Sequence, residues 1–82
     1  MIIEIKGLSY NEVVDYLDSR DAGEDALDIY IDDFGYVDAE EGDMRRLVEI
    51  QINALDESEE NFLVEVIDDL SDEEPDIEVN YL

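Results

Sequence analysis

The chain has 82 residues, enough for one small domain, and 45% of them are hydrophobic, so it can bury a core. Asp and Glu number 27 against four Lys and Arg, which gives a formal net charge of −23. Cysteine and histidine are absent, which excludes disulfides, zinc sites with nitrogen or sulfur ligands, and histidine catalysis. Solubility needs a net charge of only about 2 to 8, so the excess requires another cause.

The first residues, MIIEIKGL, do not have the basic and long apolar regions of a signal peptide, and we expect none. No apolar run approaches the roughly 18 residues of a membrane-spanning helix, and an acidic protein is repelled by anionic lipid. We therefore expect a cytoplasmic protein that does not contact a membrane.

The first predicted elements are a strand and a helix. Residues 2–6 (IIEIK) are β-branched, which predicts a strand. Ser9 and Glu12 have the spacing of a capping box, and apolar residues then recur at helical intervals. This pattern predicts a helix over residues 10–19.

Two alternating segments follow. Residues 27–33 (LDIYIDD) predict a strand that can continue through residue 37, with Gly35 as a bulge. Residues 46–53 (RLVEIQIN) alternate again; a helix is an alternative there, but the β-branched content favours a strand. The two strands would form a hairpin with residues 38–43 (DAEEGD) as its tip.

A second helix and a last strand complete the chain. Ser58 is expected to cap the helix, and its predicted apolar face consists of Phe62, Leu63, Val66, Ile67 and Leu70. For Phe62 the favoured interpretation is core packing. After Pro75, residues 76–81 (DIEVNY) alternate and predict the final strand.

The order strand-helix-strand-strand-helix-strand is that of the ferredoxin-like split βαβ fold. We therefore expect a single acidic α+β domain over residues 1–82, with an antiparallel sheet and both helices on one face. In this topology the hairpin tip and the connection from the second helix to the last strand lie at the same end. The acidic runs at residues 38–43 and 71–76 should then form one patch.

Several acids are placed against local rules, which marks them as functional candidates. Asp68, Asp69 and Asp72 crowd the C-terminal end of a helix, where the helix dipole disfavours anions. The open sheet face would be mostly acidic too, with Glu4, Lys6, Asp28, Tyr30, Asp32, Glu49, Gln51, Glu78 and Asn80. The residues predicted to contact a partner are Tyr30, Asp32, Asp33, Tyr36, Asp38, Glu40, Glu41, Asp43, Asp68, Asp69, Asp72, Glu73, Glu74 and Asp76.

Metal binding and catalysis are less favoured than binding to a protein partner. The segment from Asp18 has Gly23 where a calcium loop of the EF-hand type needs it, but Arg20, Ala22 and Ile29 occupy ligand positions. Paired carboxylates can hydrolyse glycosides, but they need a cleft that this short chain hardly provides. We expect no enzyme, no cofactor and no metal site. We expect no direct binding of nucleic acid, because no basic stripe is present to contact phosphate.

The favoured interpretation is an acidic surface that binds a protein built to hold nucleic acid. In size, charge and lack of Cys and His, the chain resembles the DNA-mimic inhibitors carried by bacteriophages and mobile elements, which include anti-restriction and anti-CRISPR proteins. The resemblance covers the whole chain as composition and charge layout, and it carries over no functional residue and no fold. It implies an inhibitor that occupies the DNA-binding channel of a bacterial defence complex, with a CRISPR–Cas effector favoured as the target.

Two alternatives to such an inhibitor stay open. The chain can be an acidic adaptor or regulator of a basic nucleic-acid-binding protein. Acidic proteins of salt-loving organisms are another comparison, although a chain rich in isoleucine and without threonine does not match their usual composition. Self-repulsion argues against dimers joined through the acidic patch, and the oligomeric state otherwise stays open.

Overall fold

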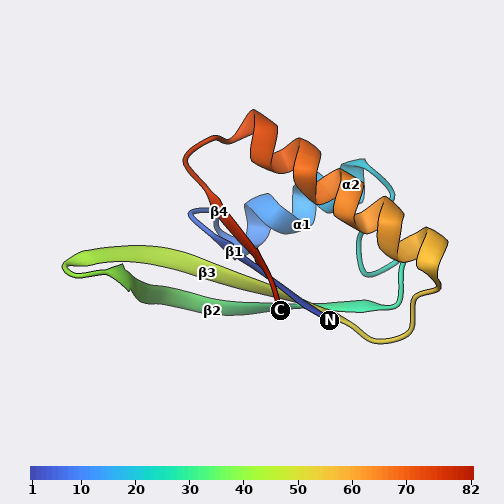
Figure 1. Ribbon diagram of the computed structural model, residues 1–82, viewed down its shortest axis with the longest axis horizontal. Coiled ribbons are helices and arrows are strands. Elements are labelled where there is room, and N and C mark those ends of the chain that lie inside the picture. The colour runs from blue at the N-terminus through green and yellow to red at the C-terminus, as the bar shows by residue number, and fades with distance from the viewer.

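The computed structural model describes the backbone of residues 1–82 and the side chains of every residue except Ala39 and Glu40. Its elements are β1 (Ile2–Lys6), α1 (Tyr10–Ser19), β2 (Ile29–Glu40), β3 (Asp43–Ile52), α2 (Glu57–Glu73) and β4 (Glu78–Tyr81). The strands form one antiparallel sheet in the order β2-β3-β1-β4, and both helices lie on the same face of it (Figure 1). The predicted α+β order is confirmed, and the strand arrangement is that of the split βαβ fold.

The core lies between the sheet and the helices. Cross-strand register pairs Ile3 with Ile50 and Ile5 with Val48, and all four side chains are fully buried. The helices cover them with apolar side chains that include Leu17 of α1 and Leu63, Ile67 and Leu70 of α2. Each such residue stabilises the fold by about 1.5–3 kcal/mol. Among the described side chains, none that is polar or charged is buried, so the acidic residues lie outside this core.

Capping boxes begin both helices. The predicted box at α1 is confirmed, with the Ser9 hydroxyl accepting from the Glu12 amide at 3.2 Å. The cap predicted for α2 is wrong by two residues, because Asp56 and not Ser58 precedes the first helical turn. The Asp56 carboxylate accepts from the Glu59 amide at 2.8 Å, and Glu59 accepts from the Asp56 amide at 3.3 Å. Asp is as good an N-cap as Ser, and a negative charge there also interacts favourably with the helix dipole.

This cap makes a prediction that separates the two candidates. Asp56→Ala should lower the free energy of unfolding by about 1 kcal/mol, because it leaves an amide of the first turn without a partner. Ser58→Ala should change it by less than about 0.5 kcal/mol, since Ser58 is an exposed helical residue. Asp56→Asn retains the capping oxygen and should lose less than Asp56→Ala. Urea unfolding of the three variants tests this; a larger loss in Ser58→Ala would contradict the assignment.

A two-stranded arm extends beyond the rest of the sheet. β1 pairs with β3 only as far as Leu47, whereas β2 and β3 stay paired to Glu40 and Asp43. We call residues 36–46 the arm; it projects past both helices at one end of the domain (Figure 1). The expected tip over residues 38–43 is too long, because only Glu41 and Gly42 lie between the strands. Gly42 permits this short turn by adopting a φ of +80°.

A bulge at the base of the arm changes which face the side chains occupy. Asp33 lies opposite Val48 and Tyr36 opposite Arg46, so the register of β2 shifts by one residue against β3. Gly35 has a φ of +68°, and its amide donates to the Asp33 carboxylate at 2.9 Å. The predicted bulge is therefore confirmed. The extra residue turns Tyr36 toward the helix side of the sheet, while Tyr30 stays on the open side.

Candidate protein-docking surface

The four basic side chains are all engaged within the domain. Lys6 pairs with Glu78 at 3.6 Å. Arg20 lies 3.5 Å from Asp69 and 3.6 Å from Glu73. Arg46 donates to the Tyr36 hydroxyl at 3.0 Å, and its guanidinium lies 5.3 Å from the centre of that ring. Little positive charge is thus left to attract an anionic ligand.

The fourth basic residue, Arg45, connects the arm to the end of α2. Its Nε lies 3.2 Å from the Asp43 carboxylate, and its Nη1 donates to the Asp76 carbonyl oxygen at 3.3 Å. The start of β3 therefore lies beside Asp76 of the α2–β4 connection. We call the two acidic segments, residues 38–43 and residues 68–76, together the acidic end; Arg45 is the link between them that the described side chains provide.

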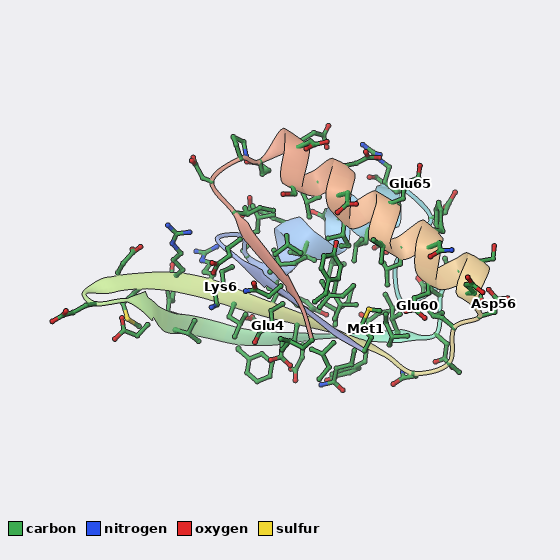
Figure 2. The ribbon with its side chains drawn as sticks, in the orientation of Figure 1. Met1, Glu4, Lys6, Asp56, Glu60 and Glu65 are labelled. Atoms are coloured by element: carbon green, nitrogen blue, oxygen red, sulfur yellow. The ribbon has the colours of Figure 1, made fainter. Side chains whose placement is uncertain are left out.

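The helix α2 carries carboxylates along most of its length. Its 17 residues span about 25 Å at 1.5 Å per residue. Figure 2 shows Asp56 at its start and Glu60 and Glu65 along its first half. The carboxylates within the helix are Glu57, Glu59, Glu60, Glu65, Asp68, Asp69, Asp72 and Glu73. Arg20 offsets one of these charges near the C-terminal end, where the helix dipole disfavours anions.

The structure divides the predicted contact residues between two faces. Of the acids in these two segments, Arg45 links Asp43 to Asp76. Asp38 and Glu41 lie on the arm, which projects past both helices (Figure 1), while Asp68, Asp69, Asp72 and Glu73 lie on the last turns of α2 and Glu74 follows the helix. Glu40 also belongs to the arm, but its side chain is outside the described residues. Tyr30 and Asp32 face the open side of the sheet and are separate from the acidic end. Asp33 lies on the helix side at the bulge.

Several of these acids also have local structural partners. Asp68 accepts a hydrogen bond from the Tyr81 hydroxyl at 3.1 Å and so ties α2 to β4. Burial of that hydroxyl, together with its bond to Asp68, raises the pKa of Tyr81 to about 12. Asp33, Asp43, Asp69 and Glu73 hold the internal contacts given above. The exposed side chains of Asp38, Glu41, Asp72, Glu74 and Asp76 make no hydrogen bond or ion pair to a described residue, which makes them the best candidates for partner contact.

Phe62 was predicted in the core, and that prediction is wrong. Its side chain is 40% exposed on the outer surface of α2, where it lines a shallow groove with Glu57, Ser58, Asn61 and Glu65. The helical repeat contains the missed signal, because Phe62 lies about 90° around the helix from the centre of the buried stripe. An exposed ring among carboxylates is a candidate anchor for a partner.

The arm also exposes large apolar groups. Tyr36 is 60% exposed and Met44 57% exposed, and both lie beside Arg45 and Arg46 in a shallow hollow that reaches Gly7 at the end of β1. The sequence indicates Tyr36 as a candidate contact residue but not Met44, because an exposed methionine has no periodic signal when the length of the arm is unknown. The arm therefore combines acidic side chains near its tip with apolar groups at its base.

Comparisons with known proteins found no match among protein families, curated proteins or solved structures. Within the part of the chain whose side chains are described, no three acidic residues are grouped so that they could hold a metal ion. The same part contains no helix long and apolar enough to cross a membrane. The charged surface is the feature of this protein from which a function can be inferred.

Proposed function

We propose that this protein is a DNA mimic that inhibits a bacterial defence complex by occupying its DNA-binding channel. The inhibition is steric and electrostatic and involves no catalysis. The favoured target is a CRISPR–Cas effector, because small inhibitors of that kind are numerous; a restriction enzyme is the second choice. The protein would act in the cytoplasm of the host cell.

The observation that carries the proposal is the charge density along α2. One strand of duplex DNA presents a phosphate about every 3.4 Å of helix axis, or roughly seven over 25 Å. The eight carboxylates of α2, less the charge offset by Arg20, leave seven negative charges over the same length. A channel lined with Lys and Arg to hold a DNA strand would therefore meet a similar amount of negative charge.

The arm adds exposed carboxylates outside the helix. Asp38 and Glu41 are exposed near its tip, and Arg45 holds the arm beside the α2–β4 connection. Long-range attraction steers the acidic surface of α2 and the arm toward a basic channel. This attraction raises the association rate more than the final affinity. Tyr36 on the arm and Phe62 on α2 have exposed rings, which can supply the apolar contacts that hold a complex together.

A capture experiment tests the proposal. The tagged protein is incubated with lysate of a host that has CRISPR–Cas and restriction systems, and the bound material is eluted with duplex DNA. We expect duplex DNA to release a basic DNA-binding complex. Poly-glutamate at equal total charge is the control and should release little of it, because its flexible chain does not hold its charges at a fixed spacing. A partner that DNA cannot displace would contradict mimicry and favour the adaptor.

A further inference from the structure

The open face of the sheet carries three carboxylates in direct cross-strand register. Asp32 of β2 lies opposite Glu49 of β3, which lies opposite Glu4 of β1. Asn80 of β4 completes the row; Glu4 lies midway along β1 (Figure 2). Directly opposite residues have Cβ atoms about 4.5–5.5 Å apart, and like charges there destabilise a sheet. The fold therefore keeps this row at a cost in stability.

Two aromatic rings flank the outer end of the row. Alternation along β2 places Tyr30 and Asp32 on the same open face, about 7 Å apart along the strand. Phe34 follows two residues later, directly before the bulge glycine Gly35. The two rings are 51% and 47% exposed, so a phenylalanine stands half in water on a highly charged surface. Neither ring belongs to the core or to the packing partners of the core. An acidic surface that only interacts with water would not explain why two aromatic rings are exposed on it.

The cation nearest to the row leaves it uncompensated. Lys6 occupies the neighbouring row, opposite Leu47 on one side and Glu78 on the other, and its ammonium pairs with Glu78 at 3.6 Å. Glu4, Asp32 and Glu49 make no ion pair with a described residue, and all three are half-buried against the sheet. A cation from outside would therefore gain more here than at a fully exposed carboxylate, because partial burial reduces screening by solvent.

Rings beside carboxylates select one kind of cation. A guanidinium is planar, stacks on an aromatic face and donates two parallel hydrogen bonds to a carboxylate, whereas an ammonium is a compact, strongly hydrated charge. We infer that the open sheet face is a second docking surface, which binds arginine side chains presented by a basic protein partner. The guanidinium groups bind Asp32 and Glu49 and stack on Tyr30 or Phe34. The inference concerns the face opposite the helices and does not depend on DNA mimicry.

Peptide titration of the full chain tests this surface. Tri-arginine amide and tri-lysine amide carry the same charge, and amide chemical shifts in two-dimensional NMR report where each binds. We expect tri-arginine to shift the amides around Glu4, Asp32 and Glu49 and to bind at least about fivefold more tightly than tri-lysine. The variant Tyr30→Leu/Phe34→Leu keeps the carboxylates but loses the stacking surface, so its preference for tri-arginine should fall below about twofold. Phe62→Leu is the matched control, since it removes an exposed ring from α2 and should leave the arginine preference unchanged.

Three results would overturn the inference. The two peptides could bind the unmodified protein equally, as a merely solvated acidic face would. The shifts could centre on α2 and the arm instead of the open face. The preference could also persist undiminished in Tyr30→Leu/Phe34→Leu; thermal unfolding of that variant shows first that it is folded.

Discussion

The variant Asp38→Lys/Glu41→Lys should bind the captured partner about 100-fold more weakly than the unmodified protein. Both side chains are exposed on the arm and make no hydrogen bond or ion pair to a described residue, so their replacement should leave the fold intact. A hydrogen bond to a charged group contributes about 1.5–3 kcal/mol, and each 1.4 kcal/mol changes the dissociation constant tenfold. Loss of two such contacts accounts for the expected effect, which isothermal titration at fixed ionic strength measures.

A matched variant distinguishes the effect of where the charge lies from the effect of the net charge. Asp15→Lys/Asp25→Lys changes two exposed acids on α1 and in the α1–β2 connection, and both double variants have a net charge of −19 in place of −23. We expect the second variant to lose less than about threefold, because distant rim charges contribute mainly to the association rate. Equal losses would show that only net charge matters. Unchanged binding of the arm variant would exclude the arm and make the open sheet face the next candidate.

Salt should have opposite effects on the isolated protein and on its complex. A charge of −23 on a domain of 82 residues repels itself, and this repulsion destabilises the compact state. The screening length falls from about 10 Å at 0.1 M salt to about 3 Å at 1 M. Raising NaCl over this range weakens the repulsion and should therefore increase the melting temperature. Salt also weakens the few surface ion pairs, but each of these contributes only about 0–1 kcal/mol to stability.

The same change in salt should weaken the complex more than about tenfold, because the attraction between an acidic surface and a basic channel is screened. Melting temperatures and dissociation constants measured in one set of buffers test both signs together. MgCl₂ at matched ionic strength is the control and should act like NaCl if screening is the cause. A melting temperature that falls with salt would refute the repulsion argument, and a salt-independent dissociation constant would refute electrostatic docking.

The sequence predicts the fold well where periodicity is strong. Helix α1 begins and ends at the predicted residues, because Ser9 is the only good cap before a clear helical repeat. The start of α2 was misplaced because Asp56 and Ser58 are both good caps, and the geometry of the preceding turn selects between them. The predicted tip of the arm was too long, because β2 and β3 stay paired up to a two-residue turn that contains the left-handed Gly42. The alternation of side chains does not reveal where such pairing stops.

The candidate site was predictable only in part. Topology alone predicts that the hairpin and the α2–β4 connection share an end, and the bond from Arg45 to the Asp76 carbonyl places the start of β3 beside that connection. The projection of the arm tip past both helices was not predictable, because it depends on how far β2 and β3 stay paired beyond β1. The sequence suggests a bulge at Gly35 but not its exact register against β3. That register decides the face of each aromatic residue, because one extra residue places Tyr36 on the helix side while Tyr30 faces the open side. Partners such as Arg20 for Asp69 are far apart in sequence and have no local signal.

The most direct test of DNA mimicry is an equilibrium competition on the captured partner. The partner is saturated with fluorescently labelled duplex DNA, and the protein is added while anisotropy reports bound DNA. Mimicry predicts complete release of DNA, with an apparent dissociation constant for DNA that rises linearly with the concentration of the protein. A plateau at which DNA and the protein are bound to the partner together would contradict occupation of the DNA channel.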